Sequence, residues 1–248
     1  MRVDLQPAYL LHARPYRDSS QLLEVFTAAH GRLSLVARGI HRRARGGSLR
    51  VNLQSFRPLL LSFAGRGELQ TLFSAEAATP PLPLAGERLF SGLYLNELLL
   101  RLLHRHDPHR ALFAAYGDAL AELAQAPASE PVLRAFELNL LGELGYGVDL
   151  SREAARHEPV REGCWYRYSE GHGLLECLPG TEAPGARFSG EELLAIARGE
   201  LGGSAAVAAK RLLRQVIAEH LGGRPLHTRE LFRQYRHRGA PEGEGVAR

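Results

Sequence analysis

The stretch Glu76-Ala77-Ala78-Thr79-Pro80-Pro81-Leu82-Pro83-Leu84 divides the chain into two parts with different periodicity. Its three prolines can continue neither a strand ladder nor a helix interior. Short runs rich in Leu, Val, Phe and Tyr precede it, and apolar residues at helical steps follow it. We therefore predict a domain boundary here, with a β domain over residues 1–78 and a helical domain over residues 79–238.

Five short strands are expected before the boundary, because each apolar run is bounded by turn residues. The runs are Ala8–Ala13, Gln21–Thr27, Arg32–Ala37, Phe56–Phe63 and Leu69–Ala75. Glycines at Gly31, Gly65 and Gly67 tolerate the positive φ that tight turns require. Five strands within about 75 residues, with one long connection, favour a small closed barrel such as an OB-fold. An SH3-like or other small barrel is the alternative.

Beyond the boundary the apolar residues follow the period of a helix. Leu89, Leu93, Asn96, Leu100 and Leu103 lie at three- and four-residue steps, which is typical of a helix buried on most of its circumference. Further helices are predicted over residues 111–124, 131–144, 205–220 and 228–235, the last with Thr228 as its cap, and a capping box at Ser189 and Glu192 begins another. Short connections predict an antiparallel bundle.

Two segments of the C-terminal half do not fit this helical pattern. Residues 151–187 lose the period and are rich in glycine, so we predict a loop-rich insertion. The tail over residues 239–248 holds too few apolar residues to pack and is expected to be disordered. The predicted fold class is therefore α+β, with an N-terminal OB-fold barrel and a mainly helical bundle after it.

Arginine is concentrated in the connection between the third and fourth predicted strands. The stretch Arg38–Arg50 holds five arginines, and no carboxylate occurs from Val25 to Gly67. Residues 1–50 carry nine arginines against three acidic residues, a local balance of +6, whereas the net charge of the whole chain is +4. A guanidinium without an internal acid can grip phosphate and stack on a base. We therefore predict that this basic loop contacts nucleic acid; the alternative is a solvated loop in an arginine-rich chain.

Patterns for catalysis or metal binding are weak in this sequence. His157, Cys164, His172 and Cys177 lack the close pairing of structural zinc sites, so we favour two partly buried cysteines over a metal. A second histidine group, His104, His106 and His109, is better explained by a favourable interaction with a helix C-terminus. The sequence contains no phosphate-binding P-loop and no clustered carboxylates for two-metal chemistry. We expect a protein that is not an enzyme and needs no cofactor.

Cysteine content and hydropathy favour a cytoplasmic protein. Two cysteines cannot form a disulfide framework, and the first residues lack the apolar core of a signal peptide. No apolar run approaches the length of about 20 residues that spans a bilayer.

The chain resembles the RecO family of bacterial DNA repair proteins, up to about Tyr235. The resemblance rests on the order and spacing of several segments together. They are Phe26-Thr27 followed by Gly31, Val36-Ala37-Arg38-Gly39, Phe56-Arg57-Pro58-Leu59, Tyr94-Leu95-Asn96-Glu97-Leu98, Leu133-Arg134-Ala135-Phe136-Glu137-Leu138-Asn139-Leu140-Leu141, Leu144-Gly145-Tyr146 and Gly223-Arg224-Pro225-Leu226.

The resemblance implies a DNA repair and recombination mediator without catalytic turnover. It implies binding of single- and double-stranded DNA, annealing of strands covered by single-stranded DNA-binding protein, and loading of RecA together with RecR. It also implies a bacterial cytoplasm, with the protein at the nucleoid during repair. Many members carry a four-cysteine zinc module after the Leu-Gly-Tyr segment. This sequence lacks at least two of those cysteines, so zinc is not carried over.

The resemblance also places candidate contacts. Arg38 lies in the family's Ala-Arg-Gly element, and Arg42, Arg43, Arg45 and Arg50 follow in the basic loop. Our own extension of this face adds Arg14, Tyr16 and Arg17 in the first inter-strand turn, with a solvated turn as the alternative.

The acidic, apolar tail of the single-stranded DNA-binding protein would need a cleft that combines guanidinium with apolar side chains. Arg101 or Arg134, beside Phe136 or Leu140, is our candidate; core leucines beside solvated arginines are the alternative.

Two other classes of function stay open from the residues alone. One is an RNA-binding OB-fold protein, because RNA offers the same phosphates and bases. The other is a metal-dependent hydrolase built on the histidine groups.

Overall fold

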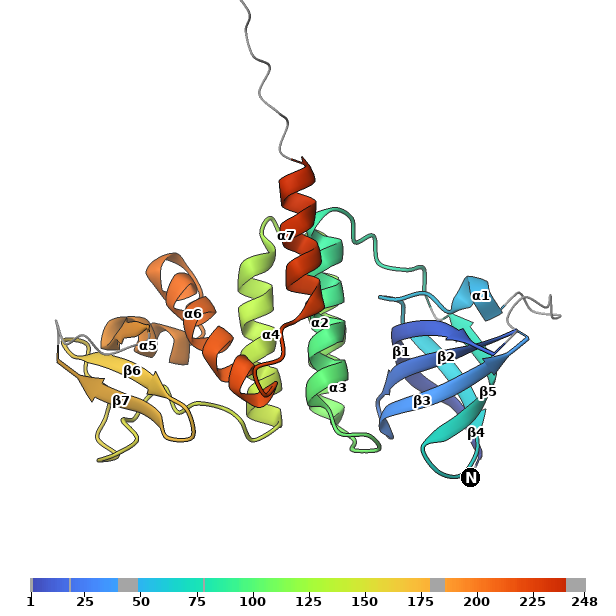
Figure 1. Cartoon of the computed structure of the whole chain (residues 1–248), viewed down its shortest axis with the longest axis horizontal. Helices are drawn as coiled ribbons and strands as arrows, with labels where there is room; N and C mark the ends of the chain where they lie inside the picture. The colour runs from blue at the N-terminus through green and yellow to red at the C-terminus, as the bar shows by residue number, and fades with distance from the viewer. Residues whose placement is uncertain (1, 18, 40–48, 78, 179–185, 240–248) are drawn as a thin grey trace, which may run out of the picture.

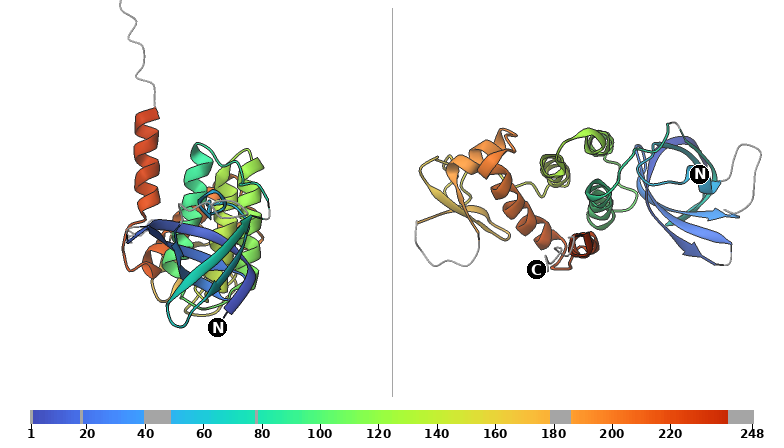
Figure 2. Two further views of the ribbon diagram at one scale, coloured as in Figure 1. Left: turned by 90° about the vertical axis from the view of Figure 1, so that its right-hand side faces the viewer. Right: turned by 90° about the horizontal axis from the view of Figure 1, so that it is seen from above.

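The computed structural model describes residues 2–17, 19–39, 49–77, 79–178 and 186–239. The molecule is elongated, with a β-barrel at one end, a small sheet at the other and helices between them (Figures 1 and 2). The predicted α+β class, with a barrel first and helices after it, is confirmed. Most of the basic loop (40–48) and of the predicted disordered tail (240–248) lies outside the described residues.

The barrel is closed by five strands in the order β1-β2-β3-β5-β4. The strands are β1 (Arg2–Tyr16), β2 (Ser20–Thr27), β3 (Gly31–Arg38), β4 (Leu59–Ala64) and β5 (Leu69–Ala77). Only the pair of β3 and β5 is parallel; the other pairs are antiparallel. Strand β1 is longer than its apolar run because its first half pairs with β4 and its second half with β2. Alternate residues fill the interior with side chains such as Leu23, Leu35 and Leu61.

A short helix, α1 (Leu49–Asn52), returns the chain from the basic loop to the barrel. Its Asn52 Nδ2 donates a hydrogen bond of 2.8 Å to the Ala75 carbonyl oxygen of β5. The loop thus begins at the end of β3 and comes back against β5.

The helices surround a second hydrophobic core. They are α2 (Glu87–Leu102), α3 (Arg110–Gln125), α4 (Ser129–Glu143), α5 (Gly190–Ala197), α6 (Gly203–His220) and α7 (His227–Gly239). The capping box of Ser189 and Glu192 is present at the start of α5. Gly145, at φ 75, follows the last turn of α4, as expected for a residue that ends a helix.

The segment over residues 151–187 contains more structure than the predicted loop. A three-stranded antiparallel sheet forms from β6 (Trp165–Ser169), β7 (Gly173–Cys177) and β8 (Arg187–Ser189), in the order β7-β6-β8. Its inner side chains, among them Tyr166 and Phe188, are buried in the helical core. Strands this short give a weak periodic signal, and this sheet is stabilised by packing against distant helices.

The barrel is seated on the helices through aromatic side chains of its outer face. The Tyr9 ring lies 5.2 Å from that of Phe113 and 5.0 Å from that of Tyr116, and Phe26 lies 5.4 Å from Phe113. Buried Asn96 of α2 connects the two parts: its Nδ2 donates to the Leu11 carbonyl oxygen at 2.9 Å, and its Oδ1 accepts from the Tyr116 hydroxyl. The two parts therefore share one core, although each has its own secondary structure.

Polar contacts at the edge of this interface fix the turn between α2 and α3 against β3. Glu24 accepts from Arg105 at 3.1 Å and from Arg32 at 3.4 Å. The Arg32 carbonyl oxygen accepts from the His106 amide at 3.1 Å. Gly31 lies directly under this turn, where an added Cβ would be 2.0 Å from the Asp107 carbonyl oxygen.

Substitution of Gly31 by Ala tests this close approach. Gly67 is the matched control, because it also has a positive φ (88, against 65 at Gly31) but nothing lies within 4 Å of its added Cβ. We expect Gly67→Ala to lower the free energy of unfolding by about 1 kcal/mol through backbone strain. We expect Gly31→Ala to cost about 2 kcal/mol more, because the Asp107 backbone must move. Urea unfolding measures both, and equal losses would contradict the close seating.

The last helix is held by a carboxylate on α2. Glu97 accepts from the amides of His227 at 2.8 Å and Thr228 at 2.9 Å and from the Thr228 hydroxyl at 2.6 Å. The α7 helix begins at His227, so Thr228 is not its N-cap as predicted; Glu97 satisfies the free amides instead. On the next turn of α2, Arg101 donates to the Pro225 carbonyl oxygen at 2.7 Å.

Stability should depend on the charge of Glu97. Burial opposes its ionisation, but the hydrogen bonds from Thr228 and His227 outweigh burial and lower the pKa of Glu97. A lowered folded-state pKa stabilises the protein above the unfolded value of about 4.3, and the contribution is lost as pH falls through the folded-state pKa. We expect Glu97→Gln to cost about 2 kcal/mol at neutral pH. The difference from wild type should shrink as pH falls below the unfolded value and through the lowered folded-state pKa.

Urea unfolding at several pH values, with hydrogen exchange of the α7 amides, measures this effect. Glu230→Gln is the control, because Glu230 is an exposed carboxylate on the same helix. A Glu97→Gln loss that stayed constant from neutral to acid pH would show that charge is not what holds α7.

Candidate functional site

One end of the barrel brings together the described residues that were predicted to contact nucleic acid. Tyr16 of β1 pairs with Ser20 of β2, and Ser20 pairs with Arg38 of β3. Paired residues on neighbouring strands share a face, so Tyr16 and Arg38 lie on the same outer surface. Arg17 follows in the turn, with its guanidinium carbon 5.2 Å from the centre of the Tyr16 ring.

Three arginines at this end have exposed side chains. Arg14 and Arg17 come from the β1–β2 hairpin, and Arg38 ends β3. Within the described parts of the chain, none of the three forms an ion pair. We call Arg14, Tyr16, Arg17 and Arg38 the barrel-end surface. Arg42, Arg43 and Arg45 lie outside the described residues, and the side chain of Arg50 in α1 is not described either.

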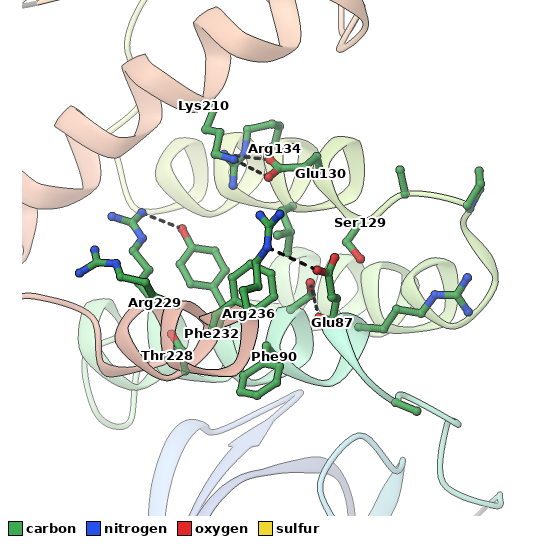
Figure 3. A pocket seen from close by; sticks show the side chains of 18 of the residues that line it. Glu87, Phe90, Ser129, Glu130, Arg134, Lys210, Thr228, Arg229, Phe232 and Arg236 are labelled. Atoms are coloured by element: carbon green, nitrogen blue, oxygen red, sulfur yellow. Dashed lines mark hydrogen bonds and ion pairs between the residues drawn. The ribbon is translucent and has the colours of Figure 1, made fainter. Parts of the chain in front are cut away.

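A pocket of about 800 Å³ opens in the helical part, between α2, α4, α6 and α7 (Figure 3). Most of its charged residues are basic. They are Arg88, Arg134, Lys210, Arg214, Arg229, Arg233 and Arg236, against the carboxylates of Glu87 and Glu130. Apolar side chains, among them Phe90, Leu133 and Phe232, line the same pocket. We call it the basic pocket; it combines positive charge with apolar surface.

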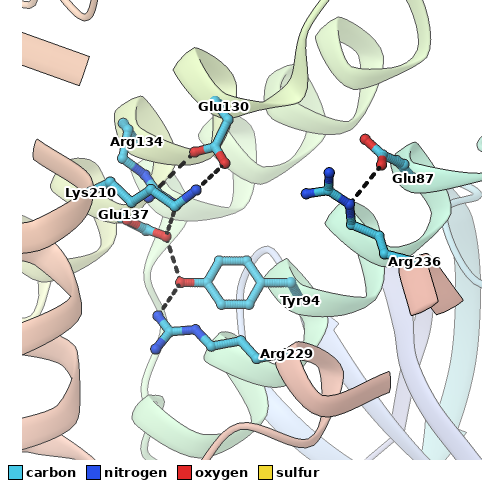
Figure 4. A network of polar contacts seen from close by, with 8 residues as sticks. All are labelled: Glu87, Tyr94, Glu130, Arg134, Glu137, Lys210, Arg229 and Arg236. Carbon is cyan, nitrogen blue, oxygen red and sulfur yellow. Dashed lines mark hydrogen bonds and ion pairs between the residues drawn. The ribbon is translucent and has the colours of Figure 1, made fainter. Parts of the chain in front are cut away.

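A polar network forms one wall of the basic pocket (Figure 4). Buried Glu137 accepts from the Tyr94 hydroxyl at 2.5 Å and from Arg134 at 2.6 Å, and Arg229 donates to the Tyr94 hydroxyl at 3.2 Å. Burial, together with the Glu137 carboxylate, raises the pKa of Tyr94. Burial also raises the pKa of Glu137, although the Arg134 guanidinium opposes this shift. The tyrosine therefore stays protonated, and this wall is a fixed hydrogen-bonded structure.

The other cations of the basic pocket differ in how closely they are paired. Arg88 donates to the carbonyl oxygens of Ala124 and Ala126, and Lys210 contacts Glu130 at 2.5 Å. Arg236 and Arg233 have only long contacts, at 3.9 Å from Glu87 and 4.0 Å from Glu230. Arg214 has no ion pair with any described residue. The α4 helix begins at the pocket, and no side chain caps its N-terminus. Free amides and unpaired guanidinium groups favour an anion here.

The structure corrects part of the predicted cleft for an acidic tail. Phe136 and Leu140 are 2% and 0% exposed, so they belong to the core and cannot line a surface cleft. Arg101 is occupied by the Pro225 carbonyl oxygen and by Glu97. Arg134 alone of the four lines the basic pocket. The basic residues of α6 and α7 were missed, because their sequence spacing does not show that these helices meet α2 and α4.

The two histidine groups do not come together as metal sites. Within the described ranges there is no group of three or more His, Cys, Asp or Glu side chains that could hold a metal ion. His109 lies at the start of α3 and contacts Asp107 and Glu143, the last residue of α4. The favourable interaction of this group with a helix C-terminus stays a prediction. His157 and His172 line a separate polar cavity of about 450 Å³ that includes neither cysteine.

No helix in the described part of the chain has both the length and the apolar character to cross a membrane.

Comparison with known proteins agrees with the fold. The model of the family described as "Recombination protein O N terminal" matches residues 1–81, and that of "Recombination protein O C terminal" matches residues 84–230. A protein of Nitrosococcus oceani is 49% identical over 96% of both chains. Proteins of Pectobacterium atrosepticum (46% identical, 93% of both chains) and Escherichia coli (44%, 93% of this chain and 94% of the relative) are similar too.

All three relatives are named DNA repair protein RecO. The family models cover both structural parts, the barrel with residues 1–81 and the helices with residues 84–230. The resemblance seen in the sequence is confirmed, and the chain belongs to the RecO family of DNA repair proteins.

Proposed function

We propose that this chain is a recombination mediator that binds single- and double-stranded DNA, anneals complementary strands and helps to load a recombinase. The observation that carries the proposal is the barrel-end surface, where Arg14, Arg17 and Arg38 are exposed without ion pairs in the described chain. Such guanidinium groups neutralise DNA phosphates and release the counterions of the DNA. Because every nucleotide has a phosphate, this binding tolerates any sequence. In the sequence the basic loop follows Arg38, and its Arg42, Arg43, Arg45 and Arg50 are proposed as further phosphate contacts.

Annealing follows from electrostatics and geometry. Two DNA strands repel each other, and a basic surface that neutralises phosphates lowers this repulsion. Contacts to phosphate carry no sequence information, so each strand is able to slip until complementary bases meet. This activity requires no bond making or breaking, and we propose no catalytic turnover for the protein.

The basic pocket supports a contact with the acidic, apolar tail of the single-stranded DNA-binding protein. Carboxylates of the tail would meet Arg214, Arg233 and the start of α4, while its apolar side chains would pack on Phe90 and Phe232. The pocket and the barrel-end surface belong to different parts of the fold, so one molecule is able to hold the tail and DNA together. RecR and RecA are proposed as further partners in loading, in the bacterial cytoplasm at the nucleoid.

The first test removes three charges from the barrel-end surface. We expect Arg14→Ala, Arg17→Ala and Arg38→Ala together to weaken binding of a single-stranded oligonucleotide. The slope of log affinity against log salt should also fall by about 0.7 for each phosphate that the variant no longer neutralises. Fluorescence anisotropy over a salt series measures both.

Alanine at Arg152, Arg161 and Arg198 is the control, because these exposed arginines carry the same total charge and lie outside the barrel, before β6 and after α5. Unchanged affinity and unchanged slope in the barrel-end variant would reject this surface as the DNA site.

The second test concerns the tail. We expect Arg214→Glu with Arg233→Glu to weaken binding of the C-terminal peptide of the cognate single-stranded DNA-binding protein roughly tenfold or more, because like charges then face the carboxylates. Isothermal titration measures the affinity, and Arg152→Glu with Arg198→Glu is the matched control. Wild-type affinity in the pocket variant would place the tail elsewhere. DNA affinity measured in parallel shows whether the variant has kept its barrel.

A further inference from the structure

Phe73 is the most exposed aromatic side chain among the large hydrophobic residues of the barrel. It lies on β5 and is 58% exposed. Its ring belongs to neither hydrophobic core of the described chain and makes no aromatic contact there. An aromatic side chain buries much apolar surface when it is covered, so leaving it open to water needs an explanation.

The strand register places Phe73 beside Arg38. In the parallel pair of β3 and β5, Ala37 is opposite Leu72, and both side chains point into the barrel. The ladder ends at this pair, and the next residues, Arg38 and Phe73, both have exposed side chains. Phe73 is the extra residue of a bulge against β4, because Leu72 pairs with Phe63 and Ser74 pairs with Ser62. Its exposed ring therefore lies on the outer surface, just past the end of the ladder on the side of Arg38.

The same register continues across the barrel to β1. Tyr16, Ser20 and Arg38 occupy paired outward positions on β1, β2 and β3, and Phe73 of β5 follows one residue beyond the last pair of β3 and β5. With strands about 4.8 Å apart, this row is about 14 Å long. An aromatic ring stands at each end of it, and a guanidinium group lies between them.

We propose that Phe73 is a base-stacking residue and that this row gives the barrel its preference for single-stranded DNA. The inference rests on the proposed DNA binding and adds the residue that discriminates between single and double strands. Arginine holds phosphate while the rings at Phe73 and Tyr16 stack on bases, the combination that single-strand-binding surfaces use.

Charge complementarity favours a strand of nucleic acid over a protein partner at this surface. Arg14, Arg17 and Arg38 lie on the same end of the barrel, and no carboxylate occurs in the sequence from Val25 to Gly67, which includes all of β3 and β4. Stacking also requires an unpaired base, because bases in a duplex already stack on one another. A duplex therefore contacts the arginines of the barrel-end surface but not the rings of the row.

The test compares Phe73→Ala with wild type on three ligands: a single-stranded oligonucleotide, the same strand with abasic sites, and the matching duplex. We expect Phe73→Ala to lose roughly fivefold to a hundredfold in affinity for the normal single strand. Affinities for the abasic strand and for the duplex should stay within about twofold of wild type, because neither offers a base to stack. Trp165→Ala, which removes an exposed aromatic from the far sheet, is the control and should bind all three like wild type.

A fluorescence readout adds direct evidence of stacking. Trp165 is the one tryptophan of the chain, so Phe73→Trp in a Trp165→Phe background carries a single reporter. Its emission should be quenched by the normal single strand and much less by the abasic strand.

The outcomes distinguish the proposed DNA binding from the proposed stacking role of Phe73. Failure of wild type to bind any DNA would overturn the proposed function. Binding by wild type with equal affinity in Phe73→Ala, or an equal loss on the abasic strand, would overturn the stacking role alone. A change in oligomeric state in Phe73→Ala, without a change in single-strand affinity, would assign the ring to a contact between copies of the protein and would also overturn it.

Discussion

Asn96 is the polar centre of the contact on which the rest of the molecule depends. Its amide nitrogen reaches the Leu11 carbonyl oxygen of the barrel, and its amide oxygen accepts from Tyr116 of α3. Asn96 is buried, and the rings of Tyr9, Phe26 and Phe113 pack against one another in the same interface. Because an unpaired polar group inside such a core is costly, the hydrogen bonds are maintained only when barrel and helices meet in one arrangement. This fixes the barrel-end surface relative to the basic pocket.

Arginines of the interface between barrel and helices have ion-pair partners, whereas several arginines of the two candidate sites have none in the described chain. Arg32, Arg101 and Arg105 are paired with Glu24, Glu97 and backbone carbonyl oxygens, where they hold the barrel and α7 in place. Arginines of the barrel-end surface have no such partners in the described chain, and Arg214 in the basic pocket has none there either. The paired arginines stabilise the fold, and the unpaired arginines are available to bind an anion.

Local patterns in the sequence predicted the parts of the fold that local physics decides. Prolines at residues 80–83 marked the change from strands to helices, and Gly31 and the pair Ser189 and Glu192 marked a turn and a cap. Contacts made by distant segments were not predictable in this way. Glu97 caps α7 from a helix more than a hundred residues earlier. The short strands β6, β7 and β8 pair with one another and pack against the helical core. Phe136 and Leu140 have sequence surroundings that do not reveal their burial. The basic pocket likewise needs four helices to meet.

We propose that one molecule receives both DNA and the tail of the protein that covers it. Strand annealing followed by fluorescence is the decisive experiment, with complementary strands each covered by the cognate single-stranded DNA-binding protein. We expect the protein to accelerate annealing of covered strands, and we expect this acceleration to be lost when the covering protein lacks its acidic tail while bare strands still anneal. An annealing rate that is the same with and without the protein, or an acceleration that does not depend on the tail, would show that the two sites do not act together.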